Sequence, residues 1–381
     1  MLLGPAAPAP AAGALPDGLS ADALGRAALL ALPSVYRLDV TARLSALRTR
    51  DGRRLELPAG ARTLRLQGTA FAIAPGGYLV GAAHVADPSD DELAAGARRL
   101  ALALAHRPHT DEIVSRWVER TGARPAGGAV LGRRLTAAAP DGAPGRVHPG
   151  ALVLADRVSD LALLRIAAPG APALLLDDAA TRGTAVAALG FGGGGGDGRS
   201  PPHEPAIRHG RLDRTGWFPR PHLATVVTAA VRRGDSGAPV VDAQGRARGV
   251  VVALHRDGGI MEDGSEVRRL LRRARFANGR GRSAALFAHA MTRLWALDAA
   301  GARRGLRATL RAYPDHSLAA RELRRVGALS AARLALEGGG RRDGVLRALA
   351  VASAAASAAC GLLLLRLSSR GRGRRGPQRA G

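Results

Sequence analysis

Three side chains in this sequence could together perform nucleophilic catalysis, namely those of His84, Asp160 and Ser236. A serine hydroxyl is a weak nucleophile near neutral pH, so it needs a base within hydrogen-bond reach. Histidine suits that task because its unperturbed pKa, about 6.5, lies near working pH. A carboxylate can then fix the imidazole tautomer and stabilise the imidazolium as it forms. These residue types indicate acyl transfer through a covalent intermediate, provided that the fold brings them together.

The Gly-Asp-Ser-Gly turn around Ser236 is the strongest chemical signal in the chain. It lies in the segment RRGDSGAPVVDAQGRARGVVVAL. Gly234 lets the backbone bend so that its N–H and the N–H of Ser236 converge on one point. Such a pair can stabilise a developing oxyanion, and removal of one donor costs about 3–4 kcal/mol in other enzymes. Gly237 keeps the space behind the nucleophile clear. A lone turn of this kind is often a plain surface turn. Here a Pro-Val-Val strand follows it in the sequence, which favours an oxyanion hole.

The other two candidate residues also stand in segments that suit their roles. His84 lies near the end of the segment GTAFAIAPGGYLVGAAHVA, and Asp160 begins the strand-like segment DLALLRI. Because that strand is almost continuously apolar, the Asp160 carboxylate would lie at the start of a buried strand. An orienting carboxylate can be desolvated there.

Taken together, the three segments resemble the trypsin/chymotrypsin superfamily, and most closely its bacterial disulfide-free HtrA-like branch, without a PDZ domain. The chain order His84, Asp160, Ser236 is that superfamily's order. The resemblance covers residues 32–297. It implies an all-β fold of two six-stranded antiparallel barrels, with His84 and Asp160 from the first and Ser236 from the second. It also implies a serine endopeptidase that acts on proteins or peptides without a cofactor or metal.

The sequence departs from the family pattern near the histidine and near the serine. A Ser or Thr usually stands three residues before the histidine, where this chain has Gly81, and Ala238 replaces a usual second glycine. Secreted trypsins use the aspartate before the serine to bind a freshly cleaved N-terminus. No such activation site is visible here, so we expect Asp235 to pair with Arg232 or Arg233. An esterase with the same triad and a catalytically impaired pseudoprotease acting as a binding module stay open as alternatives.

The resemblance also places a pocket for the substrate side chain before the scissile bond. Its base is the residue six before the nucleophile, Ala230, and its wall is formed by Val252, Ala253 and Leu254. A basic side chain buried there would lose its water without gaining a carboxylate partner. The pocket residues therefore predict cleavage after small or medium apolar residues, and poor cleavage after Arg or Phe.

The elements that must position these residues read as short strands. From Ser34 onward, alternating apolar runs are separated by Gly-Gly and Asp-Gly turn signals, which is typical of an antiparallel barrel. Residues 87–125 interrupt that texture with two helical stretches and predict a helical insertion. A linker at about 167–175 divides the barrels, and the second half includes GTAVAALGF and SAALFAHA as expected strands. Residues 298–344 predict a helical stalk that resembles one tetratricopeptide hairpin.

Both ends of the chain differ from this barrel texture. Residues 1–31 are rich in Ala and Pro and predict disorder. The uncharged run Ala348–Leu365 would span roughly 27 Å as a helix, so it predicts a transmembrane helix over 345–366, with a buried core helix as the alternative. Within about fifteen residues, more arginines follow this run than precede it, which predicts a cytoplasmic basic tail (367–381) and an extracytoplasmic protease domain. The lipid bilayer would then be a partner through a single C-terminal anchor.

Composition excludes several other classes of function. The net charge is +25, but all 56 basic residues are arginines spread along the chain, and aromatics are only 3%, so no nucleic-acid interface is expected. The single cysteine, Cys360, allows neither an intrachain disulfide nor a cysteine metal cluster. The other histidines lie outside metal-binding motifs and are expected on the surface or in loops. The Gly192–Gly196 run lacks the Lys-Ser/Thr of a phosphate-binding loop and predicts a flexible loop. Nothing in the sequence indicates an oligomeric state.

Overall fold

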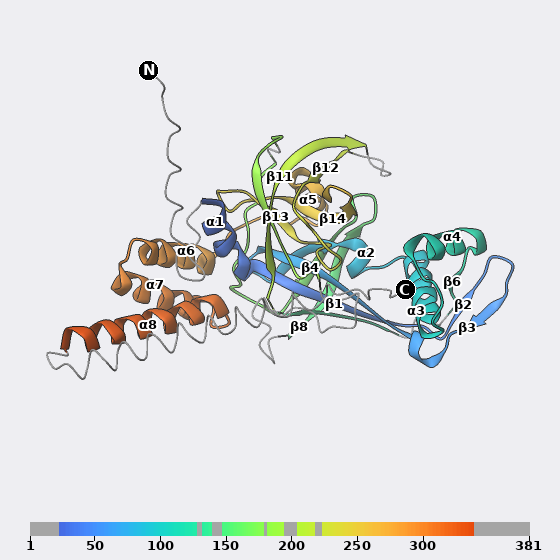
Figure 1. Cartoon of the computed structure of the whole chain (residues 1–381), viewed down its shortest axis with the longest axis horizontal. Coiled ribbons are helices and arrows are strands. Elements are labelled where there is room, and N and C mark those ends of the chain that lie inside the picture. The colour runs from blue at the N-terminus through green and yellow to red at the C-terminus, as the bar shows by residue number, and fades with distance from the viewer. Residues whose placement is uncertain are drawn as a thin grey trace, which may run out of the picture. The chain divides into compact units, whose positions relative to one another are not determined.

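The protein is represented by a computed structural model (Figure 1). It describes residues 23–127, 132–138, 147–178, 181–193, 204–217 and 223–338. The chain divides after Ala320 into two compact units, and the long helix α8 (Ser317–Gly338) crosses that boundary. All the candidate site residues lie in the first unit.

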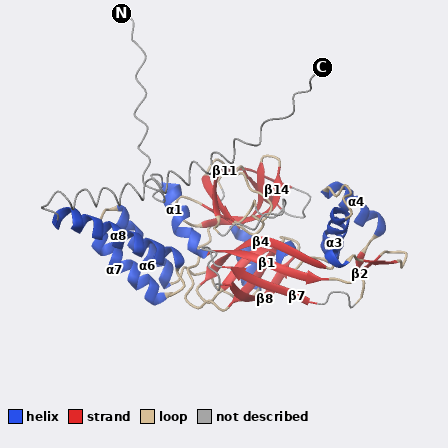
Figure 2. Cartoon of the chain, turned by 60° about the horizontal axis from the view of Figure 1, so that its bottom comes forward, coloured by secondary structure: helices blue, strands red, loops and turns tan. Residues whose placement is uncertain are grey.

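Six antiparallel strands form the first barrel (Figure 2). In hydrogen-bonded order they are β1 (Val35–Arg43), β4 (Thr63–Ala74), β5 (Tyr78–Ala82), β9 (Leu161–Ile166), β8 (Val147–Asp156) and β7 (Gly132–Ala138), which pairs back to β1. Side chains along a strand point alternately to opposite faces. Ala70 and Ala72 of β4 therefore lie in one buried cluster, whereas Phe71 and Ile73 lie in another that the second barrel shares.

The second barrel is also closed by six antiparallel strands. In order they are β10 (Ala185–Gly190), β11 (Ala206–Trp217), β12 (Leu223–Val227), β15 (Gly258–Asp263), β14 (Ala247–His255) and β13 (Pro239–Val241). Closure between β10 and β13 rests on two residue pairs only, Ala187 with Val241 and Ala188 with Val240. This strand order agrees with the two-barrel prediction. It leaves the Gly-Asp-Ser-Gly turn in the connection between β12 and β13.

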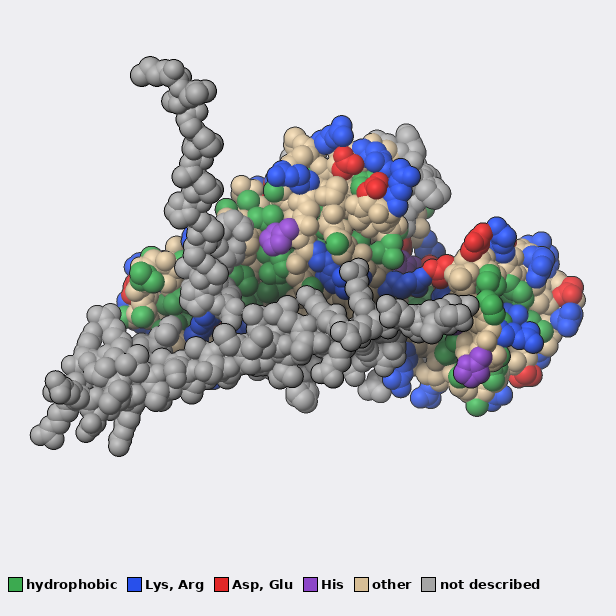
Figure 3. Space-filling model, viewed as in Figure 1, with side chains coloured by type: hydrophobic (Ala, Val, Ile, Leu, Met, Phe, Trp, Pro, Cys, Tyr) green, Lys and Arg blue, Asp and Glu red, His purple; other side chains and the backbone are tan. Residues whose placement is uncertain are grey.

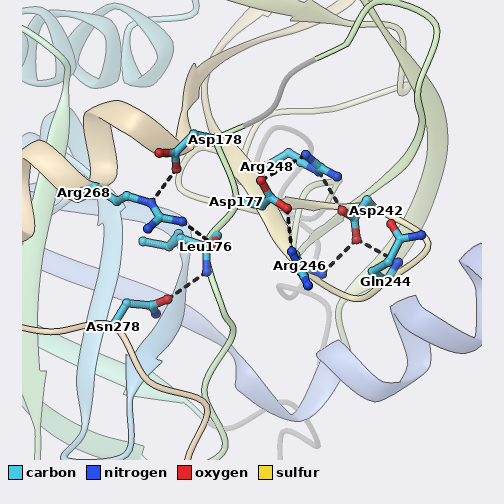
Figure 4. Close-up of polar contacts among 9 residues, drawn as sticks. All are labelled: Leu176, Asp177, Asp178, Asp242, Gln244, Arg246, Arg248, Arg268 and Asn278. Carbon is cyan, nitrogen blue, oxygen red and sulfur yellow. Dashed lines mark hydrogen bonds and ion pairs between the residues drawn. The ribbon is translucent and has the colours of Figure 1, made fainter.

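The linker between the barrels is held by polar contacts as well as by the shared core (Figure 4). The Asn278 amide donates to the carbonyls of Ile73 and Leu174, and its oxygen accepts from the Leu176 N–H at 2.9 Å. The Arg268 guanidinium donates to the Leu176 carbonyl at 2.7 Å. The Asn278 side chain thus links β4 of the first barrel to the linker, which limits movement of one barrel against the other.

The predicted insertion is present as a separately packed lobe. It contains α3 (Asp90–Leu104) and α4 (Asp111–Thr121), together with a small sheet of β3 (Arg54–Glu56), β2 (Ala46–Arg48) and β6 (Arg124–Pro125). A capping box begins α3, because the Ser89 hydroxyl accepts the Glu92 N–H and the Glu92 carboxylate accepts the Ser89 N–H. A buried cluster including Leu44, Leu64 and Leu93 joins the lobe to the ends of β1 and β4. The lobe is therefore anchored to the first barrel.

The chain is not all-β, so that part of the prediction is wrong. Besides α3, α4 and α8, the described residues form α1 (Ala23–Ala31), α2 (Ala83–Ala86), α5 (Gly264–Arg273), α6 (Arg282–Trp295), α7 (Ala299–Ala312) and the 3-10 turns Leu32–Ser34 and Ala59–Ala61. Helix α1 lies within the region predicted to be disordered, and its residues Ala27, Ala28 and Ala31 are buried. Alanine has the highest intrinsic helix propensity, and contacts with β10, β13 and α6 add to it by burying one face of the helix.

Helix α6 corrects a second expectation, because the segment SAALFAHA is helical and not a strand. Its buried residues Ser283, Phe287, Ala290 and Met291 recur at helical spacing, so one face packs against α7 and α1. A short apolar run of this kind fits either period when read alone.

The described part of the predicted stalk is helical, since it contains α7 and α8. Residues 1–22, Gly194–Gly196, the end of the stalk, the predicted transmembrane helix at 345–366 and the tail at 367–381 lie outside the described residues, so these expectations stay predictions. Within the described ranges, no helix combines the length and apolarity needed to cross a bilayer.

His316 is loop-borne as expected, but it is not on the surface. It lies between α7 and α8, is 1% exposed, and its ring centroid is 4.5 Å from that of Phe287. Its Nδ1 accepts the Ala319 N–H at 3.1 Å. Burial lowers the pKa of His316 from 6.5 to about 4.

This burial predicts a loss of stability in mild acid. Because the folded pKa lies below the unfolded one, the unfolded chain binds more protons between about pH 6.5 and 4. The contribution of His316 is complete above pH 6.5 and declines as pH falls toward 4, by about 3 kcal/mol in total. Urea unfolding at pH 7 and pH 4.5 should show a smaller loss for His316→Asn, which keeps an acceptor near Nδ1. Equal losses in the two proteins would contradict the assignment.

Candidate active site

The Asp160 carboxylate holds His84 through two contacts. His84 lies on α2, the single helical turn that follows β5 directly. Its Nδ1 is 2.7 Å from Asp160 Oδ2, and its backbone N–H donates to Asp160 Oδ1 at 2.8 Å. A carboxylate only accepts hydrogen bonds, so the Nδ1 atom carries the proton. The Nε2 atom is then the basic nitrogen of the neutral ring.

The backbone at Asp160 is held in an unusual conformation. Its φ is +54°, in the left-handed region that residues other than glycine seldom adopt. The Asp160 carbonyl accepts the Ala83 N–H at 2.9 Å. Within the same turn, the buried Asp156 carboxylate accepts the Val158 N–H and is ion-paired with Arg273 of α5. Such strain, of order 1–3 kcal/mol, persists only where the surroundings fix it, and it clusters at functional sites.

The Gly-Asp-Ser-Gly turn docks on β4 of the first barrel. The Thr69 N–H donates to the Ser236 carbonyl at 2.8 Å, and the Thr69 hydroxyl donates to the Gly234 carbonyl at 2.8 Å. Gly237 has a φ of +90°, and a Cβ there would lie 1.9 Å from the Thr69 carbonyl oxygen. Only glycine allows this approach between the two barrels.

The same approach explains one departure from the family pattern. A Cβ on Gly237 would also lie 3.0 Å from Gly81 Cα and 2.9 Å from the Ala82 nitrogen, two residues before His84. The nucleophile turn therefore lies against the segment that carries the histidine. At Gly81 itself, a Cβ would stand 3.2 Å from the Thr69 carbonyl oxygen, so a larger residue would be crowded.

Two backbone donors of the turn are available to a ligand. The Arg233 carbonyl accepts the Gly193 N–H at 3.1 Å, and the peptide bond to Gly234 is trans. In a trans peptide the N–H points opposite to the carbonyl, so the Gly234 N–H points away from Gly193. Among the described residues, no protein group accepts the N–H of Gly234 or of Ser236.

Asp235, which precedes the serine, is buried, and both oxygens of its carboxylate accept hydrogen bonds. Its carboxylate accepts the N–H groups of Gly192 and Arg232, each at 2.7 Å, and lies 3.4 Å from Arg208 Nε of β11. Arg208 also donates to the Gly192 carbonyl at 2.8 Å. Burial raises the pKa of Asp235, and the nearby Arg208 cation opposes that rise.

The main charge partner of Asp235 is therefore Arg208, which was not expected. Of the two expected arginines, Arg232 contributes its backbone N–H and a smaller favourable charge interaction, whereas Arg233 pairs with Asp111 of α4. Arg208 lies far from the turn in sequence, and in a chain with 56 basic residues nothing marks it out. Thr69 is also far from the turn in the sequence, so the sequence did not predict its contact with the turn.

The four predicted pocket residues lie on two segments of the second barrel. Ala230 is exposed in the connection after β12, and the other three belong to β14. Val252 is 2% exposed and belongs to the shared core, Ala253 is half-buried, and Leu254 is 50% exposed. Their joint role as a pocket stays a prediction. Over the ranges that the structure describes, no group of three or more His, Cys, Asp or Glu could hold a metal ion.

No curated protein matches the sequence. Among solved structures, the HtrA-type protease AlgW with a decapeptide is similar at 20% identity and a TM-score of 0.43, covering 66% of this chain and 67% of that one. AlgW with a tripeptide is similar at 19% and 0.41, covering 65% of this chain and 63% of that one, less than two thirds of its length. The family model described as a trypsin-like peptidase domain matches residues 68–250, a range that contains His84, Asp160 and Ser236. The similarity to a trypsin-like peptidase domain thus covers 183 of the 381 residues, just under half of the chain.

Proposed function

We propose that this protein is a serine endopeptidase that hydrolyses peptide bonds through an acyl-enzyme. The observation that carries the proposal is the double contact of the Asp160 carboxylate with His84, at 2.7 and 2.8 Å. It supplies the tautomer that a general base needs. The docked turn that bears Ser236 supports the same assignment.

In the proposed reaction, the Ser236 Oγ attacks the substrate carbonyl carbon while His84 Nε2 takes its proton. Asp160 stabilises the imidazolium, and the N–H groups of Gly234 and Ser236 bind the oxyanion. His84 then gives its proton to the leaving amine as the peptide bond breaks. A water molecule attacks the acyl ester in the same way and releases Ser236.

Covalent labelling separates this function from its alternatives. A fluorophosphonate probe should label the purified full chain at Ser236, which a pseudoprotease that only binds would not allow. Turnover of peptide substrates, compared with turnover of simple esters, then separates a peptidase from an esterase. Absence of labelling, or ester turnover alone, would overturn the proposal.

Replacement of Arg208 should impair catalysis without touching a catalytic side chain. Arg208→Ala leaves the buried Asp235 carboxylate without its cation, a loss that costs about 3–5 kcal/mol when a buried pair is broken. Because this loss should displace the turn that bears the Gly234 and Ser236 N–H groups, we expect kcat/KM for a peptide to fall about 100-fold.

Arg208→Lys should recover part of the activity, since it restores the charge. Arg211→Ala removes an exposed arginine from the same strand and serves as the matched control. Peptide hydrolysis and urea unfolding should be measured together for all three variants. Wild-type kcat/KM in Arg208→Ala would show that Asp235 does not depend on this cation.

Cleavage should favour small or medium apolar residues before the scissile bond. Ala230 offers no carboxylate to a basic side chain, so we expect Arg at that position to be cleaved roughly 100-fold less well than Ala or Val. Discrimination between apolar side chains should be modest, because one methylene is worth about 1–3 kcal/mol. A peptide library profile measures this preference, and Ala230→Asp should shift it toward Arg. A wild-type profile dominated by Arg or Lys would mean that the pocket lies elsewhere.

A further inference from the structure

The insertion lobe carries a groove that the proposed reaction does not use. The groove has a volume of about 460 Å³ and lies between α3 and α4. Its apolar lining consists of Leu102, Pro108, Ile113 and Trp117. Ile113 and Trp117 are four residues apart on α4, so they share one face of the helix. Ile113 is 44% exposed, which leaves apolar surface open to a partner.

Arginine makes up the rest of the lining, as Arg98, Arg107, Arg116 and Arg120. These are four of eight lining residues, above the share of 56 basic residues in 381 in the whole chain. None of the lining residues, all within the described part, is acidic. On the same lobe, at the right of the view, Figure 3 shows basic, acidic and apolar side chains close together.

The contacts of these arginines leave positive charge at the groove. The Arg98 guanidinium lies 4.9 Å from the centre of the Trp117 ring, a cation–π contact that keeps its charge. Arg116 is paired with Glu112, one turn back on α4. Arg107 and Arg120 are exposed, and their side chains contact no acidic residue among those described. An acidic partner would find two uncompensated cations there.

The lobe also contacts the nucleophile turn. Asp111, the first residue of α4, is 2.6 Å from Arg99 of α3 and is paired with Arg233, the residue before Gly234. From Asp111 to Arg120, α4 rises about 14 Å. An extended peptide advances about 3.3 Å per residue, so about five residues cover that length.

We propose that this groove is an exosite that binds an acidic segment with apolar side chains in a protein substrate, about five residues or more from the bond to be cut. As a statement about substrates it rests on the proposed peptidase function, whereas the binding itself does not. The mixed lining suits such a segment, since apolar side chains contact Trp117 and Ile113 while carboxylates meet Arg107 and Arg120. A single-stranded nucleic acid would need successive aromatic platforms, and the groove has one. A bilayer surface would not fill a concave site between two helices.

Binding is tested first, with the full chain carrying Ser236→Ala so that nothing is cut. The probe is a fluorescein-labelled ten-residue peptide of alternating Glu and Leu, and its control has Lys in place of Glu. Arg107→Glu with Arg120→Glu should raise the Kd of the acidic peptide about tenfold or more. Arg272→Glu with Arg307→Glu, at exposed sites on α5 and α7, changes net charge equally and should leave the Kd within twofold.

Equal weakening by both pairs of substitutions would overturn the exosite, because it would reduce binding to net charge. Equal affinity for the Lys peptide would overturn it too. The exosite would also be overturned if Arg107→Glu with Arg120→Glu abolished binding to anionic vesicles or to a single-stranded oligonucleotide but left binding of the acidic peptide unchanged.

Cleavage is tested second, with a short peptide substrate alone and with the Glu-Leu segment attached through a five-residue Gly-Ser linker. The attached segment should raise kcat/KM about tenfold in the wild type and not in the groove variant, while the short peptide is cut equally by both. If the wild type cuts neither substrate but binds the segment, the proposed peptidase function fails and the exosite stands. If it cuts both substrates equally and binds neither peptide, the exosite fails and the peptidase function stands.

Discussion

Ser236→Ala should abolish peptide hydrolysis, lowering kcat by roughly 10⁶-fold, the scale seen when such a triad loses its nucleophile. The substitution removes none of the described contacts of the turn, which are made by the Asp235 carboxylate and by backbone atoms, including the Ser236 carbonyl and the Gly237 N–H, which donates to the Val251 carbonyl at 2.6 Å. We therefore expect the fold and its unfolding midpoint to stay as in the wild type.

Single-turnover and steady-state assays with one peptide substrate measure this loss. Ser115→Ala, which removes an exposed serine from α4, is the matched control and should keep full activity. A Ser236→Ala protein with more than a few per cent of wild-type kcat would remove Ser236 from the mechanism. An unchanged fold and a lost fluorophosphonate label should accompany the expected result.

Asp160→Asn should have the second largest effect, about a 10⁴-fold fall in kcat. The amide offers an N–H₂ group and one oxygen, so it can bind the wrong tautomer of His84 and cannot stabilise the imidazolium. Asparagine also tolerates the left-handed region, which preserves the backbone at φ +54°. The substitution thus removes the charge and leaves the turn in place.

The control for this experiment is Asp39→Asn on β1, which removes the charge of a carboxylate that pairs with Arg37 at 2.9 Å. It should change kcat less than twofold. A loss below tenfold in Asp160→Asn would mean that the 2.7 Å contact with His84 does not contribute to catalysis.

Local pattern made the site segments and the barrels predictable. The strand before His84, the apolar strand after Asp160 and the turn at Ser236 each have a distinctive spacing within a few residues. The capped helices of the insertion were predictable for the same reason. Periodicity and turn chemistry act over short distances, so they can be read from one segment at a time.

What the sequence could not supply depends on contacts between distant segments. Helix α1 and the SAALFAHA part of α6 are Ala-rich and fit several conformations until neighbouring elements bury one face. Arg208 reaches Asp235 only because β11 and the nucleophile turn meet in the folded barrel. Thr69 joins the barrels only because its strand passes beneath that turn.

The pairing of Asp235 with Arg208 has a consequence for when activity arises. In enzymes that use a new N-terminus at this place, a cut converts a dormant zymogen into the active form. Here the cation is part of β11, so on the proposed mechanism the catalytic turn is complete as soon as the second barrel folds. Such an enzyme has no inactive zymogen that waits for a cut of that kind. Restraint on proteolysis then cannot depend on a pending cut that releases a new N-terminus for Asp235.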